Sequence, residues 1–370
     1  MNQPSSPFAL PLMYDADYEV LEEGEAETAA ELQETLLNIS ETTFKHSGHA
    51  TRSVHAKSHG LLIADIEVMP NLPPTLAQGI FAKPGSFPLV MRFSTVPGDI
   101  LDDSISTPRG LALKIIGVHG ERLEGSEGAT TQDFVLVNGP AFLTPGAKKF
   151  LGSLRLLAST TDKAPNLKRA FSAVLQGTEK ALEAVGGGSP TIKAMGGHPE
   201  TNVLGESYFS QVPILYGPYM AKVCIAPVSK ELIQLKDAPV DLTNRANGLR
   251  ESVIEFFSNQ YAVWDLRIQL CTNLDTMPIE DASVVWPEDQ SPYITVARIT
   301  AKPQQGWSDK RSATVDDGMS FSPWHGIAEH RPIGSIMRVR KMAYEVSARF
   351  RIERNQGQAI EPTSINDLAM

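Results

Sequence analysis

The chain has 370 residues, of which 42% are hydrophobic, enough to bury a large core as one big domain or two. Its net charge of −10 lies in the N-terminal arm, because residues 1–44 hold ten acids and no Lys or Arg, while the remaining acids and bases balance. The near-neutral body argues against nucleic-acid binding, and the chain has no run of about 18 apolar residues that would span a membrane.

The acidic N-terminal arm and the two cysteines indicate in which cellular compartment the protein is expected. An acidic start is unlike a secretory or mitochondrial signal, each of which begins with basic residues. The two cysteines, Cys224 and Cys271, stand in apolar runs and are expected to be reduced core thiols. We therefore expect a cytoplasmic protein.

The first predicted elements are one helix and a series of strands. Residues 25–44 are predicted to form an acidic helix with an apolar side of Leu32, Leu36, Leu37 and Ile39. The strands are apolar or β-branched runs bounded by Gly, Pro or charged turns. We expect them at Leu61–Val68, Ser86–Thr95, Arg109–Val118, Gln132–Asn138, Ser207–Val228, Ala262–Thr272 and Tyr293–Ala301.

Leu, Phe and Val recur at helical spacing in further segments. A helical insertion is predicted at about 146–186, as Gly146–Ala158 and Ala164–Val185. Another helix is predicted at Leu249–Tyr261, and a long basic helix at 334–353 ends the series.

Strands that come in runs favour an antiparallel α+β fold over a doubly wound sheet, and about eight strands can close a barrel surrounded by helices. We divide the chain into an acidic arm at 1–47 and one domain at 48–370, with strands at about 60–140 and 205–301. The arm is expected either to pack on a neighbouring subunit or to form a solvated helix. No glycine-rich phosphate loop indicates nucleotide binding.

Tyr344 follows Arg340 by four residues inside the last predicted helix, so both side chains share one face. A neighbouring cation favours the phenolate form of a tyrosine, and a phenolate is one of the few axial ligands that proteins offer to haem iron. The same spacing also occurs by chance as a surface cation beside a half-buried ring. The motif alone does not decide between these readings.

Two further segments carry candidate chemistry. His55 stands between the arm and an apolar strand, where a histidine can act as acid and base near neutral pH. His59 follows at the spacing of a helical zinc pair, but no third ligand is evident. In the strand around Phe93, Arg92 and Ser94 are predicted to share the opposite face. A buried Arg92 requires an anion, and a salt bridge to Asp99, Asp102 or Asp103 would provide one without any ligand.

These segments together resemble the monofunctional haem catalases. The matching runs are, in chain order, Arg52-xx-His55-Ala-Lys, Arg92-Phe-Ser-Thr-Val, Pro108-Arg-Gly-Leu-Ala-Leu-Lys, Asp133-Phe-Val-Leu-Val-Asn-Gly-Pro-Ala-Phe and Arg340-xxx-Tyr344. The resemblance covers about residues 48–352 and is nearest to the compact catalase-related proteins of bacteria. It implies a haem b cofactor and peroxide chemistry.

The resemblance also implies roles on the proximal side and at the haem propionates. Tyr344 matches the iron ligand, and Arg340 matches the arginine that keeps it deprotonated. Arg52 and Arg92 match arginines that hold the propionates, and Arg351 falls where a third such arginine stands.

On the distal side, His55 matches the histidine that moves a proton between the peroxide oxygens. Ser94 matches the serine that orients it, and Phe150 falls where a phenylalanine stacks on the porphyrin. The large catalases also have a distal asparagine, but alignment puts Val137 at its position and Asn138 one residue later. Either a bulge turns Asn138 inward as a catalytic residue, or the pocket lacks the amide and catalase activity is weak.

The expected function is a haem-dependent peroxidase or catalase-like oxidoreductase that takes a small hydroperoxide and an organic electron donor, as a homodimer or homotetramer. Two alternatives remain. Allene oxide synthases share the site and rearrange fatty-acid hydroperoxides, but they carry threonine where Val54 precedes His55. The other alternative is a non-enzymatic barrel that binds haem or a fatty acid.

Overall fold

The computed structural model describes residues 9–105, 107–160, 200–368 and 370. Within them, eight antiparallel strands close into a barrel, because β5 pairs with both β4 and β7. The short strand β6 pairs with β7 outside the ring. The strands are β1 (Ser58–Val68), β2 (Ser86–Thr95), β3 (Arg109–Ile116), β4 (Thr131–Val137), β5 (Tyr208–Phe209), β6 (Ile214–Tyr216), β7 (Tyr219–Pro227), β8 (Ala262–Leu270) and β9 (Ile294–Ala301). The predicted antiparallel α+β barrel is thus confirmed.

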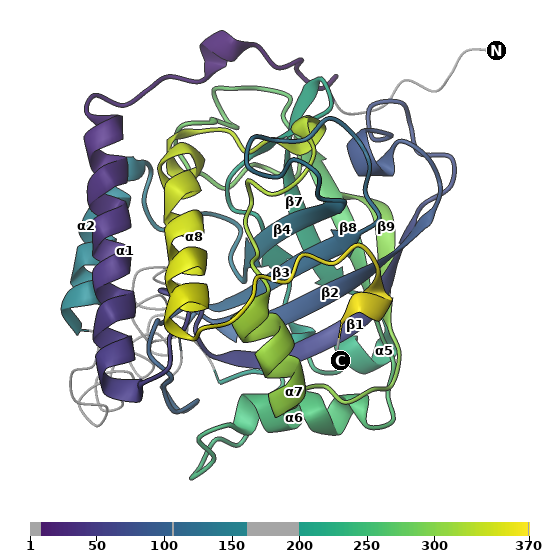
Figure 1. The fold of residues 1–370 in the computed structure, drawn as a ribbon. Coiled ribbons are helices and arrows are strands. Elements are labelled where there is room, and N and C mark those ends of the chain that lie inside the picture. Colours follow the sequence, from purple (N-terminus) through teal and green to yellow (C-terminus); the bar gives the residue numbers. More distant parts are fainter. Residues whose placement is uncertain (1–8, 106, 161–199, 369) are drawn as a thin grey trace, which may run out of the picture.

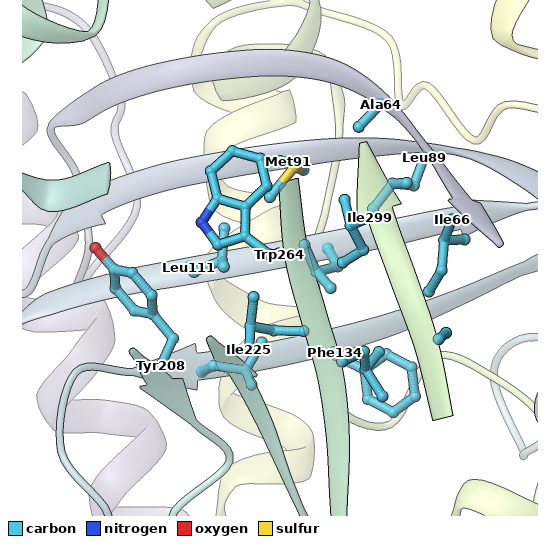
Figure 2. Close-up of a cluster of buried hydrophobic side chains, with 14 of the residues drawn as sticks. Ala64, Ile66, Leu89, Met91, Leu111, Phe134, Tyr208, Ile225, Trp264 and Ile299 are labelled. Carbon is cyan, nitrogen blue, oxygen red and sulfur yellow. The ribbon is translucent and has the colours of Figure 1, made fainter. Parts of the chain in front are cut away.

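The main hydrophobic core fills the inside of this barrel (Figure 2). Met91 and Phe93 of β2, Leu111 of β3 and Phe134 of β4 meet Trp264 of β8 there, all of them buried. Alternate residues of a strand face opposite sides, so the intervening residues of β2, β3 and β4 line the outside of the barrel. That outer face carries the candidate site.

Helices surround the barrel (Figure 1). They are α1 (Glu25–Ser47), α2 (Ala147–Thr160), α5 (Lys230–Ile233), α6 (Gly248–Phe257), α7 (Asp309–Ser312) and α8 (Ser335–Arg354). Leu32, Leu36 and Ile39 of α1 pack with Val339 and Ala343 of α8 in a second core. The apolar side of the acidic helix is therefore covered by α8 of the same chain.

The N-terminal arm also holds α8 through charges. Arg338 of α8 pairs with Glu19 and Glu25 of the arm and with Glu280, at 2.7–2.9 Å. Arg331 binds Glu19 as well, at 3.0 Å. Two of the arm's ten acids, Glu19 and Glu25, thus bind the helix that carries Tyr344.

Differences from the sequence prediction arise at turns. The single strand predicted at Ser207–Val228 is three strands, and Gly217, at a φ of 58°, makes the tight turn between β6 and β7. The helix predicted at Ala164–Val185 lies outside the described residues. Among those described, no helix is long and apolar enough to cross a membrane.

Candidate functional site

His55 lies just before β1 in a backbone conformation that is uncommon for a residue with a side chain, at a φ of 57°. Its N–H donates to the carbonyl of Val96 at 2.7 Å. The guanidinium of Arg92 donates to the carbonyls of His55 and Ala56, at 2.8 and 3.1 Å. Neighbouring residues thus hold the His55 backbone on both sides, as is common for strained residues at functional sites.

The ring of His55 is fixed by two strands. Its Nδ1 is 3.0 Å from the hydroxyl oxygen of Ser94 on β2. On β3, a β-carbon built on Gly110 would stand 2.5 Å from Cε1 and 2.6 Å from Nδ1 of the ring. Gly110 therefore provides the space in which the imidazole lies, and Nε2 is the nitrogen that remains for proton exchange.

His55 is neutral over the ordinary pH range. Burial, together with the positive charges of Arg92, Arg340 and Arg52, lowers its pKa to about 3. A neutral imidazole can accept a proton from an incoming ligand. Because the positive charge of Arg340 contributes to the lowered pKa of His55, the side of α8 that carries Arg340 lies near the imidazole.

Val137 of β4 lies on the same face of the barrel as Ser94. Strand register aligns Ser94 of β2 with Gly110 of β3 and Gly110 with Val137 of β4. Directly opposed residues in antiparallel strands point to the same face, so Val137 shares the face of Ser94 and of the His55 ring. Leu136, one residue earlier, is buried in the barrel core on the other face.

The side-chain amide of Asn138 forms hydrogen bonds with Arg109 and Glu206. It follows the last residue of β4, and its side-chain oxygen accepts from the backbone N–H of Arg109 at 2.8 Å. Its side-chain nitrogen donates to the carboxylate of Glu206, which is also paired with the guanidinium of Arg109. The side-chain amide of Asn138 is thus bonded to Arg109 and Glu206, and the catalytic role expected for it stays a prediction.

Helix α8 carries the second pair of candidate residues, Arg340 and Tyr344. The guanidinium of Arg340 donates to the hydroxyl oxygen of Tyr344, and its carbon lies 5.3 Å from the ring centre. Ser347, one turn further on, is 3.0 Å from the hydroxyl of Ser53, two residues before His55. These contacts bring the segments of His55 and Tyr344 together (Figure 1).

Arg52, Arg92 and Arg351 converge on one turn of the chain. Arg52 donates to the carbonyls of Val315, Asp316 and Met319 at 2.6–2.9 Å, and Arg351 also donates to that of Met319. Arg92 pairs with the carboxylate of Asp316 at 2.7 Å. Arg92 and Arg351 are only 2% exposed, so three cations share one largely buried region.

The three arginines repel one another. Burial, then Arg92 and Arg351, hold the pKa of Arg52 well below its usual range, and burial with Arg92 lowers that of Arg351 to about 10. Burial opposes ionisation of Asp316, but Arg92 and Arg52 outweigh it and lower its pKa. Asp316 and Asp317 are the two carboxylates that act on Arg52 and Arg351, so three cations still outnumber them and the cluster is suited to an anionic ligand.

Phe150 lies on α2 and packs edge-to-face against Phe142, with ring centres 5.0 Å apart. Both rings join a small cluster with Trp324 and Met337, the latter on α8 one turn before Arg340. The structure thus brings Phe150 beside α8, and its stacking on a cofactor stays a prediction.

Solved structures of catalases have a fold similar to that of this chain. A fungal catalase superposes with a TM-score of 0.59 at 17% identity, covering 88% of this chain and 67% of that one. A bacterial catalase gives 0.56 at 15%, covering 84% and 59%. The fold is catalase-like. Catalase A of Saccharomyces cerevisiae agrees, at 0.59 and 19%, covering 86% and 64%. This chain therefore spans about three fifths to two thirds of these catalases.

In sequence, no family model matches the chain, and no curated protein matches it. The catalase likeness therefore rests on the fold, and the chemistry is argued from the chain's own residues. The site also contains residues that sequence reasoning missed: Gly110, Glu206 and Asp316. Gly110 stands inside a quoted motif and had a local signal, whereas Glu206 and Asp316 are distant in sequence from their partners.

Proposed function

We propose that this protein is a haem-dependent peroxidase or catalase-like oxidoreductase that cleaves hydroperoxides. The observation that carries the proposal is that the Arg340–Tyr344 pair and the His55–Ser94 pair lie on segments that contact each other through Ser347 and Ser53. A tyrosine oxygen that accepts a hydrogen bond from a guanidinium is suited to bind ferric iron, and an oriented neutral imidazole is suited to move a proton.

The donor set fits haem. Tyr344 offers an oxygen ligand to iron, and the arginine cluster of Arg52, Arg92 and Arg351 carries an excess of positive charge that suits carboxylates such as the haem propionates. Bidentate pairing of guanidinium with carboxylate also suits these groups geometrically. Haem, once bound, supplies the electron-transfer chemistry that side chains lack.

The chain's own residues manage the proton. His55 Nε2 accepts a proton from the hydroperoxide and returns it to the oxygen that leaves as the O–O bond breaks, while Ser94 holds Nδ1. Two electrons from an organic donor and two protons complete the reduction of ROOH to ROH and water. Because the amide of Asn138 is bonded to Arg109 and Glu206, oxidation of a second peroxide is expected to be slow, so catalase activity is weak.

The first test is the absorption spectrum of the protein expressed with ample haem, before and after hydroperoxide is added. We expect bound haem, a rapid spectral change, and turnover of a phenolic donor. A pure binding protein would show no change with peroxide. A rearranging enzyme would consume a fatty-acid hydroperoxide without any donor.

His55→Ala isolates the distal step. We expect this variant to retain haem and lose the rapid reaction, because no other oriented base replaces the ring. His119→Ala, at an exposed position, is the matched control and should react like the parent. Equal rates in the parent and His55→Ala would remove His55 from the mechanism.

A further inference from the structure

We infer that the segment after α8 is a strap that positions the arginine cluster for carboxylate binding, and that Ile360 and Glu361 are the residues through which it acts. The strap comprises residues 355–368 and crosses the barrel strands after leaving α8 (Figure 1). The inference rests on the proposed function in one respect, that the haem propionates are the carboxylates bound.

The arginine cluster is bound to the turn at residues 313–319, in which Ala313–Gly318 form a short π-helix. Carbonyl groups in the last turn of a helix lack intrahelical donors, and here they accept from Arg52 and Arg351. The accepting carbonyls are those of Val315, Asp316, Asp317 and Met319. A shift of this turn would therefore move both guanidinium groups.

The strap holds the same turn at Gly318. The backbone N–H of Ile360 donates to the carbonyl of Gly318 at 2.9 Å. A β-carbon built on Gly318 would stand 2.5 Å from Cδ1 of Ile360, so the strap lies directly against the backbone of the turn. Ile360 also packs on the apolar cluster that contains Val315 and Met319. The strap and the arginines thus bind neighbouring carbonyls of one turn.

The next residue, Glu361, anchors the strap to the barrel. Its carboxylate accepts from Nζ of Lys114 on β3, at 3.2 and 3.3 Å, and from the hydroxyl of Thr131 on β4. It also lies 3.3 Å from Nε2 of His325. Burial opposes ionisation of Glu361, but these three partners outweigh it and lower its pKa to about 2. The anchor is therefore charged at neutral pH.

Phe321 links this anchor to the arginine cluster. Its ring centre is 5.8 Å from Nζ of Lys114 and 5.8 Å from the guanidinium carbon of Arg52. The ring is buried in the same apolar cluster on which Ile360 packs. Because close-packed groups shift together, loss of the anchor is expected to displace the turn and the arginines bound to it.

The experiment uses two metal-free porphyrins, protoporphyrin IX and its dimethyl ester, in which both propionates are esterified. Neither probe carries iron, so binding does not depend on Tyr344 or on turnover. Porphyrin fluorescence measures the Kd of each probe for the full chain without haem. We expect the parent to bind the free acid about tenfold or more tightly than the ester, because the ester cannot form charge-assisted hydrogen bonds with the arginines.

Glu361→Gln should reduce this ratio by about threefold or more and leave the affinity for the ester unchanged. Lys114 keeps Asp133 as a partner at 2.9 Å, so the variant leaves no unpaired buried cation and is expected to fold. Ile360→Ala should act in the same direction. It keeps every charge, and it decides the question if Glu361→Gln does not fold. Glu353→Gln, at an exposed position of α8, is the matched control and should keep the parental ratio.

The outcomes separate this inference from the proposed function. Strap variants that keep the parental ratio, or that lose affinity for both porphyrins alike, would overturn the inference and leave haem binding and peroxide cleavage intact. A parent that binds the ester as tightly as the free acid would overturn the propionate role of the arginine cluster and this inference with it.

Discussion

The imidazole of His55 lies in the space that a side chain on Gly110 would need. A β-carbon at Gly110 would be 2.5 Å from Cε1 of the ring, closer than any ordinary contact. The histidine and the glycine are thus matched across two segments 55 residues apart, and Gly110 acts as a positioning residue.

Gly110→Ala should therefore displace His55 from Ser94. We expect haem binding to persist and the rate of the initial peroxide reaction to fall about tenfold or more, because small misplacements of a proton-transfer group are costly. Rapid mixing with hydroperoxide measures this rate. Gly152→Ala is the matched control, since nothing lies within 4 Å of a β-carbon there. Equal rates in the two variants would show that the ring position is not set by Gly110.

The pH dependence of the peroxide reaction should be flat across the range in which an ordinary histidine titrates. His55 accepts a proton only when neutral, and its pKa is lowered from 6.5 to about 3. The reaction is therefore present above about pH 3 and is lost as the pH falls through that value. A stopped-flow profile between pH 4 and 8, at about one-unit steps, measures this. A rate that halves near pH 6.5 would contradict the lowered pKa.

The same shift bears on stability. The unfolded chain takes up the His55 proton below its ordinary pKa of 6.5, whereas the folded chain does so only near 3. Unfolded protein binds more protons in that window, so the free energy of unfolding falls on acidification by up to about 1.4 kcal/mol per pH unit. In His55→Gln this contribution disappears, and denaturant titrations at pH 6.5 and pH 5 would reveal a smaller difference than in the parent.

Arg338→Ala should destabilise the protein by about 2–3 kcal/mol. The change leaves Glu19, Glu25 and Glu280 facing one another beside the start of α8 without their shared cation. Urea unfolding measures the loss. Arg155→Ala removes a single exposed pair with Glu31 and should cost less than about 0.5 kcal/mol. Similar effects of the two changes would mean that the arm does not fix α8.

Arg351→Gln should weaken haem retention. It removes one of the three cations that surround Asp316, and a hydrogen bond to a charged group is worth about 1.5–3 kcal/mol. Transfer of haem to apomyoglobin should then be faster by about tenfold or more. Arg349→Gln, on the exposed side of the same helix, is the control. An unchanged transfer rate would remove Arg351 from the propionate site.

Local patterns were sufficient to predict most of the fold. Alternation along β2 predicted that Arg92 and Ser94 share one face and Phe93 the other, and in the structure the face of Phe93 is the one in the core. The four-residue spacing likewise put Arg340 beside Tyr344. These predictions depend only on the geometry of one strand or one helix.

The long-range pairings were not predictable from the chain alone. Three nearby acids, Asp99, Asp102 and Asp103, were the candidates for pairing with Arg92, but the carboxylate that binds it is Asp316. Asp103 pairs with Lys57 instead, at 2.6 Å. Such partners are brought together only by the closed barrel and its covering segments, so no sequence spacing indicates them.

Asn138 shows the same limit at short range. The sequence allowed it to face inward or outward, and the outcome depended on where β4 ends and on Glu206, 68 residues further on. A strand pattern cannot specify a hydrogen bond made beyond the strand's last residue.

We propose that Tyr344 binds iron, and the ferric absorption spectrum of Tyr344→Phe is the sharpest test of that proposal. Phenylalanine keeps the ring and removes the oxygen, so we predict that the variant loses its haem or shows a changed ferric spectrum. Tyr261→Phe, at a side chain 50% exposed, should keep the parental spectrum. A Tyr344→Phe protein with full haem content and an unchanged ferric spectrum would contradict the account.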